Sequence, residues 1–278
     1  MPAPAEQPDR TPAVAMTIAG SDSGGGAGVQ ADLKTFAAHG VHGTSALTAV
    51  TAQNTAEVRA VVALDPAFVR TQIETVLDDL TVRAVKTGML ANAGIVLAVA
   101  DLAREGRLPH LVVDPVLVSS SGHALVSEEG VTAYVEHLLP LAEVATPNLR
   151  EAAVLGGVAL ETLTDVDAMA AVAETIRAMG ARYVVVKGGH LQATANDVLA
   201  GPDGVTVLEA PRIVTTNDHG TGCSLSAAIA ANLALGRGVT EAVAAAKAFV
   251  ARGLAGGAGW HLGAGHGPID HFGWSAGT

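Results

Sequence analysis

The sequence predicts an α/β fold, namely a three-layer α/β/α sandwich with a mostly parallel central sheet. Short runs rich in Val, Leu and Ala alternate along the chain with longer, Ala-rich amphipathic stretches. Several short runs are apolar throughout and end in polar turns, as expected for parallel strands that are covered on both faces. Strands that alternate with helices predict right-handed βαβ units, and therefore helices on both faces of one sheet.

The individual elements follow from the period of the apolar residues. Strands are expected where apolar, β-branched runs end in turn residues, at 14–19, 45–52, 58–62, 84–86, 111–113, 143–145, 183–186, 197–199 and 206–209. Helices are expected where apolar residues recur at helical spacing, at 28–38, 66–78, 93–104, 127–138, 148–155, 165–179, 222–235 and 240–255. Residues 1–12 are expected to be a flexible tail, 13–272 a single domain and 273–278 a C-terminal tail.

Composition excludes several classes of protein. The formal net charge of −11 argues against non-specific nucleic-acid binding, which requires clustered Lys and Arg. The single cysteine excludes an intrachain disulfide and is compatible with a reducing compartment, so a cytoplasmic location is expected. The longest uncharged run, 219–236, is interrupted by polar side chains, which favours a buried helix over a membrane span.

The strongest local signal is the segment TTNDHGTGCS at residues 215–224, which an Ala-rich stretch follows. Gly220 and Gly222 permit a sharp turn with unobstructed N–H groups, and these groups form an anion site at a helix N-terminus. Phosphoryl transfer depends mainly on positioning and on stabilising charge, so a kinase needs such a site. Cys223 lies in the first helical turn, where the dipole is expected to favour a thiolate that accepts a proton from a substrate hydroxyl. A Gly-rich turn before a helix is also common without any function.

Three other polar positions are candidates with simple alternatives. Asp32 can hold a substrate amine or hydroxyl, or it is a solvated helix residue. Asn148 and Glu151, three residues apart, can hold Mg²⁺, or they form an N-terminal cap with an acidic first turn. Lys187 leaves a β-branched strand into a glycine turn, from which it can reach phosphate oxygens.

The loop at residues 19–32 contains neither a G-x-x-x-x-G-K-[ST] nor a G-x-G-x-x-G pattern, which disfavours P-loop kinases and nicotinamide enzymes. Polar and Gly-rich segments follow six predicted strands, at 20–28, 87–90, 114–122, 146–151, 187–190 and 215–223. Ligands of open α/β sheets bind beyond the carboxyl ends of the strands. These segments therefore predict one shared cleft.

The motifs together resemble those of the hydroxymethylpyrimidine/phosphomethylpyrimidine kinases of thiamine biosynthesis, in the ribokinase superfamily. They read TIAGSD at 17–22, GGAGVQADLKTF at 25–36, AQNT at 52–55, KTGML at 86–90, TPN at 146–148, VKGGH at 186–190 and HGTGC at 219–223. The resemblance covers residues 14–272 and implies a ribokinase-like kinase domain. It also implies two successive Mg-ATP-dependent phosphorylations, of 4-amino-5-hydroxymethyl-2-methylpyrimidine and then of its monophosphate.

The resemblance assigns roles to particular residues. The substrate contacts would be Gly20, Asp32, Gln53, Met89 and Val116. The ATP contacts would be Lys187, Asn148, Thr215 and Lys247, and the Mg²⁺ contacts Asn148 and Glu151. Cys223 stands where most ribokinase relatives carry an aspartate base, after the anion-binding turn of Gly220, Thr221 and Gly222. The sequence departs from the family pattern at 119–123, which reads SSSGH in a loop able to touch the phosphate of the monophosphate.

The resemblance further implies a homodimer that binds small molecules and neither nucleic acid nor membrane. Two alternatives remain at this point. One is a pyridoxal or pyridoxine kinase of the same fold, which uses the same chemistry on another ring alcohol. The other is a non-catalytic relative that binds a pyrimidine.

Overall fold

The central feature of the molecule is a nine-stranded sheet with the strand order β3-β2-β1-β4-β5-β6-β7-β8-β9. The computed structural model describes residues 11–117, 126–189 and 194–277. Three features of the sequence lie outside the described residues: the loop at 119–123, whose sequence departs from the family pattern, His190, and most of the expected N-terminal tail. The strands are β1 (Val14–Ser21), β2 (His42–Gln53), β3 (Val58–Ala63), β4 (Val82–Thr87), β5 (Leu111–Val113), β6 (Val144–Ala145), β7 (Tyr183–Val186), β8 (Asp197–Gly201) and β9 (Gly204–Leu208).

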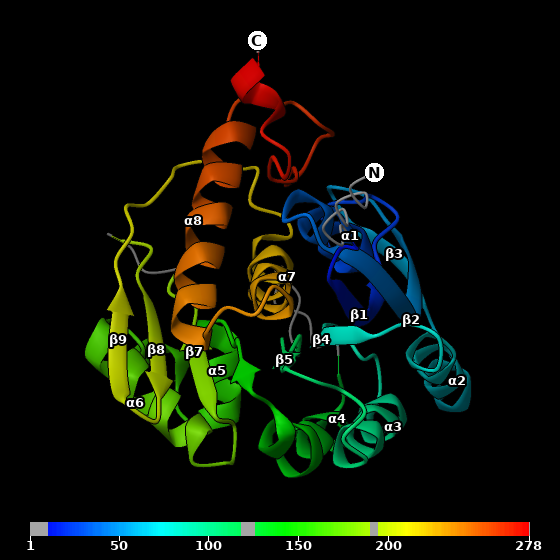
Figure 1. Ribbon diagram of the computed structural model, residues 1–278. Coiled ribbons are helices and arrows are strands. Elements are labelled where there is room, and N and C mark those ends of the chain that lie inside the picture. The colour runs from blue at the N-terminus through cyan, green and yellow to red at the C-terminus, as the bar shows by residue number, and fades with distance from the viewer. Residues whose placement is uncertain (1–10, 118–125, 190–193, 278) are drawn as a thin grey trace, which may run out of the picture.

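Helices cover both faces of this sheet, which confirms the predicted three-layer fold (Figure 1). One face carries α1 (Gly28–Ala38), α7 (Thr221–Ala234) and α8 (Val239–Gly257). The other face carries α2 (Pro66–Leu77), α3 (Ala93–Arg104), α4 (Glu128–Ala133), α5 (Leu149–Gly156) and α6 (Val166–Arg177). Because β5, β6 and β7 lie between these layers, their side chains are largely buried on both sides, which explains their apolar runs. The strand β4 is buried except at Arg83, but it carries the charged Lys86 near its end.

The direction of the strands places the functional loops. The six strands β2, β1, β4, β5, β6 and β7 are mutually parallel, whereas β3, β8 and β9 are antiparallel to their neighbours. The antiparallel strands form the two edges of the sheet. All six parallel strands therefore end at the same side of the molecule.

One predicted helix, 127–138, differs in its second half. It begins as α4 after the cap Ser127 and continues as a π-helical turn, Tyr134–Leu138, and a 3₁₀ turn, Leu139–Leu141. Pro140 has no N–H to donate, so the helical hydrogen bonds cannot continue through it. The tyrosine is fully buried, and its hydroxyl donates to the Gly88 carbonyl at 3.3 Å.

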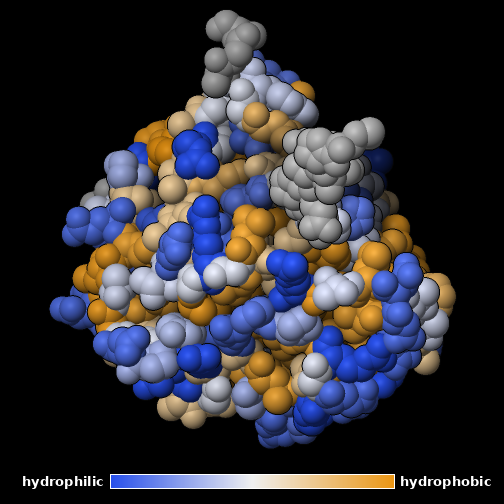
Figure 2. All heavy atoms as spheres, viewed as in Figure 1, coloured by the Kyte–Doolittle hydropathy of each residue, from blue (hydrophilic) through white to orange (hydrophobic). Residues whose placement is uncertain are grey.

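The expected buried helix 222–235 corresponds to α7, whose residues from Ser224 to Ala234 are all buried. None of the described helices is both long and apolar enough to cross a membrane. The face seen in Figure 2 carries polar and apolar residues side by side. The chain end is packed, because Trp274 in the turn Trp274–Gly277 stacks on Trp260 with ring centroids 6.1 Å apart.

Candidate active site

The predicted site residues gather at the edge where the parallel strands end. Six of them lie at or just after the end of a strand: Gly20 in β1, Gln53 in β2, Met89 after β4, Val116 after β5, Asn148 after β6 and Lys187 after β7. Asp32, Glu151 and Lys247 lie within the helices α1, α5 and α8. The turn that precedes α7 reaches the same edge, because Gly220 contacts the loop after β1. Ligands of open α/β sheets bind in this position.

The turn of Gly220 is shaped to expose main-chain N–H groups. Gly220 is the N-cap of α7, with a φ of +81° that disfavours any residue with a Cβ. A Cβ here would also overlap the carbonyl oxygen of Gly26, so the turn is pressed against the Gly-rich loop. No side chain caps the first turn of α7. The N–H of Thr221 donates to the Asp218 carbonyl at 3.3 Å, so among the described residues the N–H groups of Gly222 and Cys223 are the ones left for an anion.

Lys187 stands beside this open turn. A Cβ on Gly222 would lie 3.2 Å from Lys187 Nζ, and this ammonium donates to Asp114 Oδ1 at 2.8 Å. Burial opposes charge on Asp114, but the ammonium groups of Lys187 and Lys86 hold its pKa below the ordinary value. The buried hydroxyls of Thr146 and Ser226 also donate to this carboxylate. Asp114, which the sequence analysis missed, thus fixes a positive charge next to the helix N-terminus.

Asn148 and Glu151 form a capping box at the start of α5, as the simpler interpretation expected. Asn148 N donates to Glu151 Oε2 at 2.8 Å, and Glu151 N donates to Asn148 Oδ1 at 3.0 Å. Burial raises the pKa of Glu151 to about 7, although Lys187 lowers it, and Asp114 adds to the rise. A nearby cation stabilises the ionised form of such a buried acid.

The residues at this place fit a Mg²⁺ ion whose other ligands are water and substrate phosphate. No cluster of three or more His, Cys, Asp or Glu side chains suited to a metal occurs in the described part of the chain. Mg²⁺ in kinases is usually held by one or two protein oxygens together with water and substrate phosphates. The oxygens of Asn148 and Glu151 are compatible with that role beside Lys187.

Asp32 is not a solvated helix residue, because its side chain is fully buried. Both of its oxygens accept from Lys86 Nζ, at 3.0 and 2.8 Å, and Oδ2 also accepts from Thr17 Oγ1 at 2.6 Å. Burial alone would lower the pKa of Lys86, but Asp32, Cys223 and Asp114 raise it above its ordinary value. A charged Lys86 therefore holds the carboxylate that was expected to meet the substrate.

The expectation of a thiolate at Cys223 is wrong for the ligand-free protein. Burial raises the pKa of this thiol to about 11, although the Lys86 ammonium and a hydrogen bond from Gly28 lower it. The carboxylates of Asp32 and Asp114 contribute to the rise. Cys223 as a residue is partly exposed, but the protein packed around its sulfur still outweighs the helix dipole, so the side chain is a thiol at neutral pH.

The predicted substrate residues surround the end of β1. A Cβ on Gly20 would lie 2.5 Å from Met89 Cε, so the methionine covers the glycine directly. Val116 is partly exposed, and its N–H donates to the Asp114 carbonyl at 2.9 Å. Gln53 is partly exposed at the end of β2, beside the imidazole of His219. Met89 and Val116 can pack against the face of a flat ring, and the Gln53 amide can hydrogen-bond to its edge.

The two outer ATP candidates hold the surrounding loops. Lys247 Nζ donates to the Ala195 carbonyl at 2.6 Å and to Asp197 Oδ2 at 2.7 Å. The other oxygen of Asp197 accepts from Gly188 N at 2.9 Å, so Lys247 fixes the turn after Lys187. Thr215 Oγ1 accepts from the N–H of Asn217 at 2.9 Å, within the segment that leads to α7.

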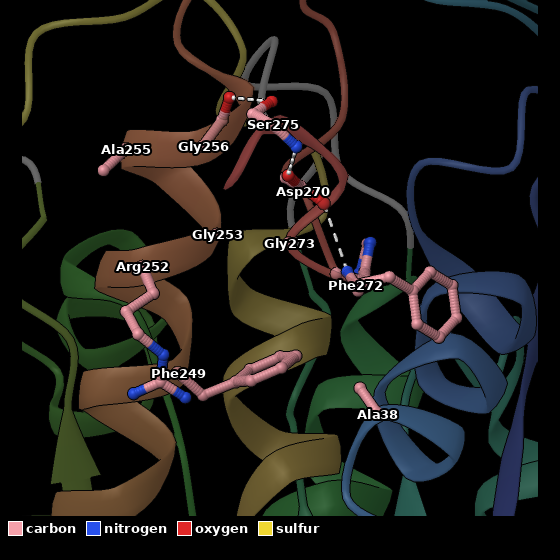
Figure 3. A pocket seen from close by; sticks show the side chains of 11 residues that line it. Ala38, Phe249, Arg252, Gly253, Ala255, Gly256, Asp270, Phe272, Gly273 and Ser275 are labelled. Carbon is pink, nitrogen blue, oxygen red and sulfur yellow. Dashed lines mark hydrogen bonds between the residues drawn. The ribbon is translucent and has the colours of Figure 1, made fainter. Parts of the chain in front are cut away.

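A separate cleft of about 660 Å³ lies between the ends of α1 and α8 and the C-terminal segment, which is the stretch after α8 at residues 258–277 (Figure 3). Phe249 and Arg252 project toward it from α8, and Phe272 from the C-terminal segment. None of the predicted site residues lines this cleft. It meets the site only indirectly, because its residue His271 contacts Ser224 Oγ through Nε2 at 2.9 Å.

A family model described as phosphomethylpyrimidine kinase matches residues 22–270. The chain belongs to this family. It is 51% identical to the hydroxymethylpyrimidine/phosphomethylpyrimidine kinase of Rhizobium meliloti, over 94% of this chain and 97% of that protein.

Solved structures of similar proteins confirm the ribokinase-like fold of this kinase family member. A pyridoxal kinase of Bacillus subtilis in complex with ADP superposes with a TM-score of 0.85 and 41% identity, covering 94% of this chain and 98% of the other. A phosphomethylpyrimidine kinase of Clostridium difficile has a TM-score of 0.76 and 42% identity, covering 86% and 97%.

Proposed function

We propose that this chain transfers the γ-phosphoryl group of ATP to the hydroxyl of 4-amino-5-hydroxymethyl-2-methylpyrimidine, and then phosphorylates the monophosphate, as in thiamine biosynthesis. The observation that carries the proposal is the charged Lys187 beside the uncapped first turn of α7. These groups lie at the same edge of the sheet as Gly20, Met89 and Gln53. A phosphate donor and a ring alcohol are thus expected to meet there.

Three groups of this chain divide the chemistry. The N–H groups at the start of α7 and the Lys187 ammonium stabilise the charge on the transferring phosphoryl group, as fixed donors in a partly buried site do. Asn148 and Glu151 would hold a Mg²⁺ ion, which would supply positive charge to the phosphates of bound ATP. The thiolate form of Cys223 would accept the proton of the substrate hydroxyl; the thiol must first release its own proton to solvent, and the Lys86 ammonium favours this release.

A coupled assay tests the proposal directly. The purified protein is incubated with Mg-ATP and the pyrimidine alcohol, and ADP is followed together with the mono- and diphosphate products. Formation of both phosphate esters is expected. Formation of the monophosphate without the diphosphate would show that the chain does not catalyse the second phosphorylation. Residues 119–123 would then be the first to substitute in a search for the cause.

The runner-up substrate is pyridoxal or pyridoxine. It is favoured by the 41% identity to a protein that is named a pyridoxal kinase. Measurement of kcat/KM for both ring alcohols under the same conditions separates the two. We expect the pyrimidine to be preferred, and a higher kcat/KM for pyridoxal would reverse the assignment. Absence of ADP formation with either alcohol would revive the non-catalytic alternative.

We also infer a homodimer formed through the ribbon of β2 and β3. The edge strand β3 is exposed along its whole length, and its residue Val62 is 64% exposed beside the exposed Val50 of β2. An exposed apolar edge strand readily pairs with a second copy of itself. Val62→Lys is expected to give a monomer in light scattering, and a variant that stays dimeric would exclude this face.

ATP as donor and a single free cysteine are consistent with a cytoplasmic location.

A further inference from the structure

The imidazole of His219 joins three segments next to the anion-binding turn. His219 directly precedes Gly220, and its Nε2 lies 3.0 Å from Asp22 Oδ2 in the loop after β1. The same nitrogen lies 3.3 Å from the side-chain amide of Gln53, at the end of β2. The ring is mostly buried, and a Cβ on Gly26 would overlap it. The imidazole is therefore confined between a carboxylate and an amide.

Asp22 determines which nitrogen of His219 carries a hydrogen. Its buried carboxylate accepts from the N–H groups of Gly24, Gly26 and Ala27, at 2.8, 3.0 and 2.8 Å. Burial opposes ionisation, but His219 and these N–H groups hold the pKa of Asp22 below its ordinary value. An ionised carboxylate only accepts hydrogen bonds. Nε2 of His219 must therefore be an N–H donor, whether the ring is neutral or protonated.

A fixed donor at His219 in turn fixes the orientation of the Gln53 amide. Nε2 of Gln53 faces Nε2 of His219, and two N–H donors in contact repel each other. A half-turn of the amide leaves its shape unchanged and places Oε1 against the imidazole N–H, which then donates to both Asp22 Oδ2 and Gln53 Oε1 as a bifurcated hydrogen bond. The NH₂ group of Gln53 then points away from His219. The main chain of Gln53 is already held, because its N–H and its carbonyl both bond to Ser23 Oγ.

We propose that His219, held by Asp22, orients Gln53 so that its NH₂ group faces the bound ring, and that this pair selects rings whose edge presents a hydrogen-bond acceptor such as an unprotonated aromatic nitrogen. The proposal rests on the proposed function, since that function places Gln53 at the substrate. His219 is a positioning residue that acts through Gln53. A ring with an N–H at the same edge meets a second donor and is rejected.

Steady-state kinetics of a double-mutant cycle tests the coupling. His219→Phe removes the N–H and is expected to raise the KM for the pyrimidine alcohol about tenfold, the worth of one well-made hydrogen bond, while the KM for ATP stays within about twofold. In a Gln53→Ala background the same change has no further effect on the KM for the alcohol. Equal effects of His219→Phe in both backgrounds would overturn the proposal.

Two matched variants separate orientation from local disruption. His219→Gln keeps an N–H donor for Asp22 and is expected to restore part of the KM lost in His219→Phe. His261→Phe changes an exposed histidine in the C-terminal segment and is expected to leave every KM unchanged. If His219→Gln behaves like His219→Phe, the donor is not what matters and the proposal fails.

A spectroscopic measurement keeps the test independent of catalysis. ¹⁵N NMR of imidazole-labelled protein reports the tautomer of His219, assigned by comparison with His219→Phe. A hydrogen on Nε2 is expected at all pH values where the protein is folded, and a ring protonated on Nδ1 alone would contradict the proposal. If the unaltered protein phosphorylates neither ring alcohol, the proposed function fails. The tautomer of His219 still tests whether its Nε2–H can orient the Gln53 amide.

Discussion

The protonation state of Cys223 can be read directly, because it is the single cysteine of the chain. Alkylation by iodoacetamide proceeds through the thiolate and so reports this side chain alone. With a pKa of about 11, the thiolate fraction rises about a hundredfold between pH 7 and pH 9, without a plateau. A thiol with an ordinary pKa near 8.5 would rise only about 25-fold and level off near pH 9.5. The assay is the rate of mass increase in the ligand-free protein across this range.

Substitutions identify the cause of the shift. Lys86→Met removes an ammonium that lowers the pKa of the thiol, so alkylation is expected to be slower at every pH. Arg59→Met removes a cation on the exposed edge strand β3 and is expected to leave the profile unchanged. Cys223→Ser serves as the unlabelled control. A plateau near pH 7 would show a resting thiolate and would refute the argument that burial outweighs the helix dipole.

Three further predictions concern the phosphoryl site. Gly220→Ala is expected to lower kcat/KM at least about a hundredfold, because the new Cβ displaces the turn from Gly26. The control Gly236→Ala has a similar φ of +84° and nothing near the new Cβ, so it is expected to cost about 1 kcal/mol of stability and no activity. Equal losses of activity in the two variants would contradict this. Lys187→Met leaves buried Asp114 unpaired and is expected to destabilise the protein by about 3 kcal/mol in denaturant titrations. Adding Asp114→Asn is expected to restore stability and not kcat, and recovery of kcat would exclude a direct role for Lys187. Cys223→Ala is expected to lower kcat about a hundredfold with ATP binding unchanged in calorimetry, and normal turnover would remove the proton-accepting role.

Much of the fold follows from local patterns in the sequence. The helices 28–38 and 93–104 begin and end where the apolar period and the flanking turn residues indicate. Buried strands such as β7 are recognisable because they are apolar throughout. The π-helical turn at Tyr134–Leu138 has no comparable signal, since a helix continues the same apolar spacing.

The site was predictable where motifs gather at strand ends and unpredictable where distant charges pair. Lys86 and Asp32 lie 54 positions apart, and Lys187 and Asp114 lie 73 apart, so no spacing rule connects them. The chain has only four lysines, and two of them, Lys86 and Lys187, lie at the ends of buried strands, where a lysine needs a carboxylate partner. The thiolate expectation failed because the dipole rule does not include the cost of desolvation.

We propose that the N–H groups of Gly222 and Cys223, at the start of α7, bind the transferring phosphoryl group beside the Cys223 side chain. A crystal structure with a non-hydrolysable ATP analogue, Mg²⁺ and the pyrimidine alcohol measures this most directly. We expect γ-phosphate oxygens at about 3 Å from these main-chain nitrogens and the alcohol oxygen within hydrogen-bonding distance of Cys223 Sγ. A γ-phosphate bound away from the first turn of α7 would contradict it.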